Sequence, residues 1–182
     1  MALKATIFRA ELAVADMDRG HFATYTLMLA RHPSETDERM MVRLLAFALN
    51  ASEALTFGRG LSTEDEGDLM QRDLTGAIES WIDVGLPDEK SLRKASGRAG
   101  RVVVYAYGGR AVDLWWAKNR GTLERLPNFS AFDVPLESSR ALAALAQRTM
   151  QLTCTVQDGH LWIGNATETV EVALTVLAQQ QV

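Results

Sequence analysis

The chain has 182 residues, which is the size of one domain with room for a hydrophobic core. Hydrophobic residues make up 47% of it and charged residues 23%, so the composition is that of a globular protein and excludes a largely disordered chain. The formal net charge of −4 gives no general support for nucleic-acid binding. A single cysteine, Cys154, excludes an intrachain disulfide and a cysteine-rich metal site.

Neither end of the sequence nor its interior predicts a membrane partner. The first residues lack the charged and apolar regions of a signal peptide, and no apolar run approaches the ~18 residues of a membrane-spanning helix. We therefore expect a cytoplasmic protein. Cys154 lies on the apolar side of an alternating strand, so we interpret it as a buried small hydrophobic residue rather than a nucleophile.

The first half of the chain predicts a β-hairpin, a helix and three strands. Alternation in the first 30 residues, interrupted by turn residues at 16–20, predicts the hairpin. Ser34 is the expected N-cap of a helix that continues to about residue 53, with Asp37 at the third position of a capping box. The three strands that follow are expected at residues 55–61, 68–74 and 77–85.

The second half predicts a similar mixture of helices and strands. A continuous apolar run at residues 102–107 is typical of a strand covered on both faces, which occurs in parallel pairing through a crossover helix. The other expected elements are helices at 88–99, 110–119 and 136–147, a strand at 126–134, a hairpin turning at 158–159, and a last strand at 170–176.

The stretch at residues 76–94 concentrates residues that could do chemistry. Side chains alternate along a strand, so Asp83 shares a face with Glu79 and Trp81 near the strand's end. Pro87 ends the strand, and the next residue can cap a helix. Lys90 and Lys94 share one flank of that helix, because they are four residues apart.

Charge is segregated around this stretch. Residues 90–112 contain six basic residues and no acidic one, whereas an acidic cluster lies just upstream, at Glu64, Asp65, Glu66 and Asp68. A nucleic-acid partner would therefore bind over the helix at 88–99. The residues expected to contact it are Arg93, Lys94, Arg98 and Arg101.

Several short runs, in order along essentially the whole chain, are similar to those of the bacterial YaeQ family. They are residues 1–7, 31–35, 38–41, 85–89, 111 with 115–116, 148–150 and 157–159. That family resembles a variant of the PD-(D/E)XK restriction-endonuclease-like fold. The resemblance implies a single α/β (α+β) domain over residues 1–182. Its core would be αβββαβ with a mixed sheet, flanked by N-terminal and C-terminal β-hairpins.

The resemblance also implies site residues. The first acidic residue of the nuclease pattern falls on Asp68, after Gly67 where the motif has proline, and the second falls on Asp83. The lysine expected two residues later is missing, because Gly85 stands there. Lys90 or Lys94 could fill its place, and the core-helix glutamate of many members matches Glu38.

These residues suit a site for Mg²⁺ or Mn²⁺, which prefer oxygen ligands. Asp68 and Asp83 would be ligands, with Glu38 as a third ligand or as the holder of a water on the metal. The metal would activate a water for attack on a phosphodiester, and a lysine would stabilise the transition state. The leading hypothesis is a divalent-metal-dependent phosphodiesterase or nuclease acting on nucleic acid.

Each of these residues also has a purely structural interpretation. Asp68 could be a solvated loop acid, and Asp83 could pair with Lys90 or cap the next helix. Glu38 could interact with a helix dipole, and the two lysines could be a solvated flank. Gly85 favours the alternative function, a catalytically inactive, nuclease-derived module that binds nucleic acid or protein in transcription or repair.

Overall fold

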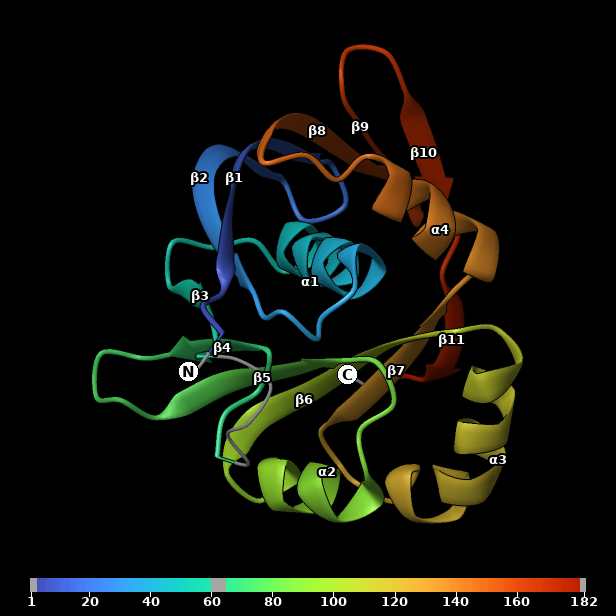
Figure 1. The fold of residues 1–182 in the computed structure, drawn as a ribbon. Coiled ribbons are helices and arrows are strands. Elements are labelled where there is room, and N and C mark those ends of the chain that lie inside the picture. Colours follow the sequence, from blue (N-terminus) through green and yellow to red (C-terminus); the bar gives the residue numbers. More distant parts are fainter. Residues whose placement is uncertain (1–2, 60–64, 181–182) are drawn as a thin grey trace. The chain divides into compact units, whose positions relative to one another are not determined.

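The computed structural model describes residues 3–59 and 65–180, and its contacts divide the chain into two compact units. Unit 1 consists of Met1–Ala51 and Glu137–Ala173, and unit 2 of Ser52–Leu136 and Leu174–Val182. The described residues form an α/β structure with four helices and two mixed sheets (Figure 1). One sheet lies in each unit. The single domain over residues 1–182 stays a prediction.

The sheet of unit 1 joins the two predicted hairpins. Its strand order is β10-β9-β8-β1-β2. The strands are β1 (Thr6–Asp16), β2 (His21–Arg31), β8 (Thr149–Gln157), β9 (His160–Gly164) and β10 (Thr169–Val172). The turn between β8 and β9 lies at Asp158 and Gly159, as predicted, and both have the positive φ that a two-residue hairpin turn requires (52° and 77°). Parallel pairing of β1 with β8 then connects the hairpins.

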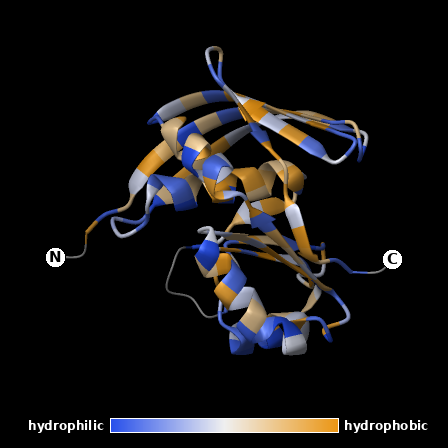
Figure 2. Cartoon of the chain, turned by 90° about the vertical axis from the view of Figure 1, so that its right-hand side faces the viewer, coloured by the Kyte–Doolittle hydropathy of each residue, from blue (hydrophilic) through white to orange (hydrophobic). Residues whose placement is uncertain are grey.

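Strand alternation gives this sheet one buried and one exposed face. In Figure 2 its strands alternate between hydrophobic and hydrophilic residues. On β1, Phe8, Ala10, Leu12 and Val14 are buried, whereas the residues between them are exposed or half-buried. The buried face packs on α1 (Asp37–Leu49), in which residues 40–48 are all buried.

The start of α1 differs from the prediction. Thr36 is the N-cap, because its side chain accepts a hydrogen bond from the backbone N of Arg39. Ser34 is instead engaged in a turn with His32, whose Nδ1 lies 3.1 Å from the backbone N of Ser34 and 2.7 Å from its Oγ. The helix also ends at Leu49 rather than near residue 53, so the predicted boundaries were wrong at both ends.

The sheet of unit 2 has the order β11-β7-β6-β5-β4-β3. Its strands are β3 (Leu55–Phe57), β4 (Leu69–Arg72), β5 (Ile78–Val84), β6 (Ala99–Tyr107), β7 (Phe129–Val134) and β11 (Thr175–Ala178). The predicted succession of helix, three strands, helix and strand is confirmed. Residues 60–61 of the first predicted strand, and Glu64, lie outside the described residues.

Strand β5 is central in this sheet, antiparallel to β4 and parallel to β6, so Asp83 is not on an edge. Helix α2 (Glu89–Ser96) makes the crossover from β5 to β6, and α3 (Arg110–Leu123) makes the next one to β7. Trp81 on β5 belongs to the same buried cluster as Leu92 of α2 and Trp115 of α3. No described helix is long and apolar enough to cross a membrane.

The end of the chain corrects another prediction. The single strand expected at residues 170–176 is two strands, β10 in unit 1 and β11 in unit 2. Val172 is fully buried in the first sheet, whereas Val176 pairs with Phe132 in the second. Helix α4 (Leu136–Ala144) is also shorter than the predicted 136–147. Hydrophobic alternation predicts strands but carries no information about which sheet each one joins.

Cys154 lies on the buried face of β8 with no exposed surface, which confirms its interpretation as a buried residue. Burial raises the pKa of its thiol to about 12, and the carboxylate of Asp16 adds to the rise, while Arg19 opposes it. Because the thiolate is the reactive form, the folded protein protects this residue twice, by burial and by its pKa.

We expect Cys154 to resist a thiol reagent at pH 8 while the protein is folded. A pKa near 12 leaves about 10⁻⁴ of the thiol ionised at that pH, against roughly a quarter for a free cysteine. Reaction with 5,5′-dithiobis(2-nitrobenzoate) should be at least ~10³-fold slower than in 6 M guanidinium. Equal rates in both conditions would contradict the buried position.

A buried ion pair fixes the connection between β2 and α1. Glu35 is 7% exposed, and its carboxylate accepts hydrogen bonds from Nε (2.7 Å) and Nη2 (2.9 Å) of Arg43. Nη2 of Arg43 also donates to the backbone O of Ala30 at 3.1 Å, and Arg39 adds a weaker contact to Glu35. A paired arginine and carboxylate of this kind hold their segments in one geometry.

Replacing Glu35 should destabilise unit 1 by about 3 kcal/mol, because Arg43 would stay buried without its partner. Glu89→Ala is the control, since Glu89 forms a partly exposed pair with Arg93 and should cost under ~1 kcal/mol. Urea titration followed by circular dichroism measures both changes. A cost for Glu35→Ala no larger than that of the control would show that the buried pair has no special weight.

Candidate functional site

Asp68 and Asp83 lie opposite each other at the ends of neighbouring strands in unit 2. In the antiparallel β4–β5 pair, Leu69 is opposite Ile82, and the same register one residue further sets Asp68 opposite Asp83. Directly opposed residues share a face, with Cβ atoms about 5 Å apart. The structure therefore brings together the two carboxylates that the sequence predicted as metal ligands.

Hydrogen-bond donors hold the two carboxylates in place. The backbone N of Asp68 donates to Oδ1 of Asp83 (3.2 Å), and the backbone N of Val84 donates to Oδ2 of Asp68 (2.8 Å). Trp81 Nε1 donates to Oδ2 of Asp83 at 3.0 Å. Each carboxylate thus accepts an N–H from the other's segment, which offsets part of the repulsion between like charges.

Trp81 is a member of this site that the sequence analysis placed on the face of Asp83 without giving it a role. It is 3% exposed and belongs to the core cluster, but its indole N–H also orients Asp83. The signal in the sequence was alternation, because residues two apart on a strand share a face. The N–H of a buried tryptophan normally requires a hydrogen-bond acceptor, and the carboxylate of an acid two residues away can be that acceptor.

Gly67 departs from the proline of the motif for a steric reason. A Cβ at this position would lie 2.9 Å from both Cδ1 and Nε1 of Trp81. Any side chain would displace the indole that donates to Asp83. The glycine therefore belongs to the construction of the site.

Gly85 occupies the position of the missing lysine, and its backbone excludes a ready replacement. Its φ is +99°, a conformation that residues other than glycine rarely adopt. A Cβ at this position would have space, since among the described residues only Tyr107 would lie within 4 Å of it, at 3.9 Å. Its backbone N donates to the O of Tyr105 at 2.9 Å, which fixes this geometry. A lysine here would be strained by the backbone rather than by lack of space.

The helix after Gly85 carries the predicted basic residues. Asp88 caps α2, and the hydrogen bond from the backbone N of Ser91 holds the pKa of Asp88 below its usual value. Lys90 lies exposed in the first turn, and Arg93 pairs with Glu89 at 2.7 Å. The position of Lys90 near the carboxylate pair stays a prediction.

Lys94 and Arg98 share an acidic partner, Asp65. Nζ of Lys94 lies 3.0 Å from its Oδ1, and Nη1 of Arg98 lies 3.3 Å from the same atom. The hydrogen bond from Lys94 is the main cause that lowers the pKa of Asp65. The guanidinium of Arg98 also lies over the ring of Trp81, 5.6 Å from its centroid. Nothing in the sequence singled out Asp65 from its acidic neighbours.

Arg101 is separated from the other predicted phosphate contacts. Its Nε donates to Oγ of Ser80 at 2.8 Å, and Ser80 alternates with Trp81 along β5. Arg101 therefore lies on the face of the sheet opposite Trp81. The structure groups Lys94 and Arg98, through Asp65 and Trp81, with the carboxylate pair.

Glu38 belongs to unit 1, where it lies half-buried in the first turn of α1. Its Oε1 accepts a hydrogen bond from Oγ of Ser139 at 3.2 Å. That contact links α1 to α4 within unit 1. Its participation as a third acidic group beside Asp68 and Asp83 stays a prediction.

The donor chemistry of the pair fits a hydrated Mg²⁺ or Mn²⁺. These ions are commonly held by one or two carboxylates and keep several waters. Three N–H donors orient these carboxylates: Asp83 accepts at both Oδ1 and Oδ2, and Asp68 accepts at Oδ2. Within residues 3–59 and 65–180, no group of three or more His, Cys, Asp and Glu is arranged to hold a metal, so the pair itself is the candidate.

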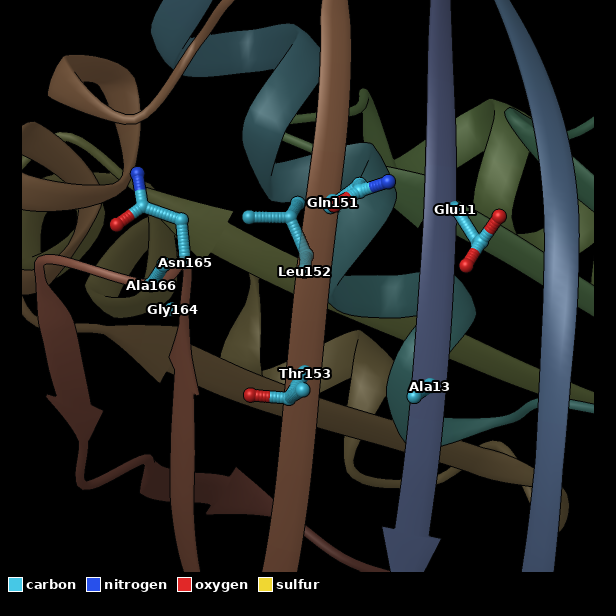
Figure 3. A pocket seen from close by; sticks show the side chains of 8 residues that line it. All are labelled: Glu11, Ala13, Gln151, Leu152, Thr153, Gly164, Asn165 and Ala166. Carbon is cyan, nitrogen blue, oxygen red and sulfur yellow. The ribbon is translucent and has the colours of Figure 1, made fainter.

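A separate hollow of about 320 Å³ lies on the exposed face of the unit 1 sheet (Figure 3). It is lined by Glu11, Ala13, Gln151, Leu152, Thr153, Gly164, Asn165 and Ala166. The Asn165 side-chain oxygen is already engaged by Thr167 and the backbone N of Glu168. With a single carboxylate in its lining, this hollow is a weaker candidate than the aspartate pair.

The chain matches the family model described as YaeQ protein over residues 1–174. It is 44% identical to the "Uncharacterized protein YaeQ" of Escherichia coli (strain K12) and to that of Salmonella typhi, in each case over 98% of this chain and 99% of the relative. Among solved structures, the YaeQ protein from Xanthomonas axonopodis pv. citri superposes with a TM-score of 0.93 and 47% identity, covering 96% of this chain and 98% of that one. The Pseudomonas syringae protein gives 0.92 and 35%, covering 96% and 97%. These similarities confirm the resemblance that the sequence motifs predicted.

Proposed function

We propose that this chain, which belongs to the YaeQ family, is a divalent-metal-dependent phosphodiesterase with Asp68 and Asp83 as its metal-binding carboxylates. The observation that carries the proposal is the opposition of two carboxylates across the β4–β5 pair, each oriented by N–H donors. The order α1-β3-β4-β5-α2-β6 supports a nuclease-like core as part of the same proposal.

The residues of the chain have distinct roles in this proposal. A bound Mg²⁺ or Mn²⁺ would supply activation of water and neutralisation of charge on the phosphodiester. Asp68 and Asp83 hold the ion, and Trp81 together with the backbone N–H groups keeps their oxygens oriented.

The basic residues bind the rest of the substrate. Lys94 and Arg98 both contact Asp65. The polyanionic backbone of a nucleic acid would compete with Asp65 for these two basic side chains. Lys90 and Arg93, on the same helix, would extend this contact along α2. One of the lysines would also take the transition-state role of the residue missing at Gly85.

Removing either aspartate charge should weaken Mn²⁺ binding at least about 10-fold, because each carboxylate is a ligand. Asp68→Asn and Asp83→Asn preserve shape, and the unfolding free energy should stay equal or rise, since one of two opposed charges is removed. Isothermal titration with Mn²⁺ and hydrolysis of bis(4-nitrophenyl) phosphate measure binding and turnover.

Asp73→Asn is the matched control for these variants. Asp73 also accepts backbone N–H groups, from Thr75 and Ala77, but lies in the β4–β5 turn at the other end of the strands. If Asp68→Asn and Asp83→Asn bind Mn²⁺ as the wild type does and are only less stable, the aspartates are structural and the metal site is refuted.

A second candidate function is a nuclease-derived module that binds nucleic acid or protein without turnover. The observation that favours it is the backbone at Gly85, whose φ of +99° disfavours a lysine in the usual place. In this case Asp65 acts as an internal competitor that occupies Lys94 and Arg98.

Asp65→Asn should tighten nucleic-acid binding several-fold, because it leaves Lys94 and Arg98 available for phosphates. Lys94→Gln with Arg98→Gln should weaken it and reduce the slope of log K against log salt by roughly 0.7–0.9 for each phosphate that is no longer neutralised. Fluorescence anisotropy with single- and double-stranded oligonucleotides at 50–200 mM salt measures both.

Lys118→Gln on α3 is the control, since it removes an exposed charge of the same unit away from Asp65. Binding without cleavage in Mn²⁺ would favour the module over the enzyme. Binding that responds equally to Lys118→Gln and to the Lys94 and Arg98 pair would contradict the proposed surface.

A further inference from the structure

Strand β2 is the last strand of the unit 1 sheet and pairs on one side only. Its register with β1 runs through all 11 residues without a shift. In Figure 1 no other described element of unit 1 continues the sheet beyond β2. The strand therefore presents a long, regular edge.

The outward backbone groups of this edge can be assigned from two contacts. The backbone N of Arg9 donates to the O of Arg148, which turns Arg9 toward β8 and away from its β2 partner, Met28. In an antiparallel pair this directs the N–H and C=O of Met28 away from β1. The O of Ala30, two residues on, is indeed accessible to Arg43. By alternation, the backbone groups of residues 22, 24 and 26 face the same way as those of Met28.

The edge lacks the features that normally prevent strands from joining. Natural edge strands are protected by lysines, prolines, bulges or short length. Residues 22–30 contain no charged residue and no proline, and the β1–β2 register has no bulge. The side chains of Phe22 and Met28 are 66% and 58% exposed. Such an edge is suited to pairing with another strand.

We propose that β2 pairs antiparallel with β2 of a second copy of this chain, about a two-fold axis, to form a dimer. The strand is self-complementary in one register. Thr24 then lies opposite the partner's Thr26, and Phe22 lies opposite the partner's Met28. The two-fold axis gives two such Phe–Met contacts, so that the exposed hydrophobic side chains of both copies are covered. Sulfur–aromatic contacts of this kind are favourable. The two five-stranded sheets become one continuous sheet.

The charge distribution along the edge fits this occupant. The uncharged core of the edge creates no like-charge contact. At its ends the register sets Arg31 toward the partner's Arg19, and each arginine is ion-paired within its own chain, Arg19 with Asp16 and Arg31 with Asp37. Four residue pairs would exchange about eight backbone hydrogen bonds. Edge pairing buries less than a standard interface of ~1,600 Å², so we expect a dimer that dissociates in the micromolar range.

Sedimentation velocity from about 1 to 200 μM tests the dimer directly. Thr26→Pro removes an outward N–H and no hydrogen bond within the chain, and proline is tolerated at such edge positions. The dimer dissociation constant should rise at least 10-fold, while the thermal midpoint of the monomer stays unchanged. A wild-type chain that is monomeric at 200 μM would overturn the proposal.

A charge pair tests the register without any risk to the backbone. Thr24→Lys with Thr26→Lys sets lysine opposite lysine across the axis and should abolish the dimer. Thr24→Glu with Thr26→Lys sets opposite charges together and should restore or strengthen it, while the lysine introduced at position 26 stays beside Glu11 of its own chain in both variants. Thr153→Lys, on the same face of central strand β8, is the control and should leave the dimer unchanged. Equal behaviour of the two double variants would refute this register.

Cysteine cross-linking gives an independent answer. A mixture of the Phe22→Cys and Met28→Cys variants should form a disulfide-linked heterodimer, because opposed residues lie about 5.5 Å apart at Cα, within disulfide range. Either variant alone should not cross-link, since its two cysteines would lie about 20 Å apart. Cys154 is buried and does not interfere. Cross-linking of either variant alone, or none in the mixture, would contradict the proposed pairing.

Discussion

Asp68 and Asp83 bear like charges on directly opposed positions of two strands, an arrangement that costs free energy unless donors offset it. In unit 2 the immediate surroundings supply donors that include two backbone N–H groups and the indole of Trp81. The geometry around them follows from this requirement. Gly67 must leave space for the indole, and the core cluster with Leu92 and Trp115 keeps the ring in position. In the proposed function, a cation bound between the carboxylates would offset the repulsion that these donors leave.

Charged side chains around the aspartate pair contact one another in sequence. Asp65 takes up Lys94 and Arg98, and Arg98 lies over the same indole that donates to Asp83. Exposed pairs of this kind are individually weak, so they can be exchanged for contacts with a phosphate at little cost. Within the acidic cluster just before β4, Asp65 therefore contacts the basic helix directly.

The sequence predicted the elements of unit 2 other than β11, and it predicted that Asp68 and Asp83 belong to one site, because these depend on local patterns and on motif positions. Alternation sets the faces of β5, and Pro87 and Asp88 set the start of α2. The cap of α1 was misassigned, because the choice between Ser34 and Thr36 depends on a local turn with His32.

Other features depend on the tertiary structure and have no sequence period. Division of the last predicted strand into β10 and β11 depends on which sheet has an open edge, and the role of Asp65 depends on a contact 29 residues away. Trp81 was predicted to share a strand face with Asp83, but the hydrogen bond between them could be found only by asking where the indole N–H of a buried tryptophan goes.

The path of the chain has a consequence for how the protein is made. The first strand, β1, pairs with β8, with Arg9 opposite Thr149, and unit 2 receives its last strand, β11, only at the C-terminal end. Neither sheet can be completed until almost the whole chain has left the ribosome. Pairings so distant in sequence close slowly, because a long loop must be ordered before its contacts form. Until β8 arrives, within the last fifth of the chain, the edge of β1 that it covers has no partner strand, which makes the nascent chain dependent on rapid arrival of that segment.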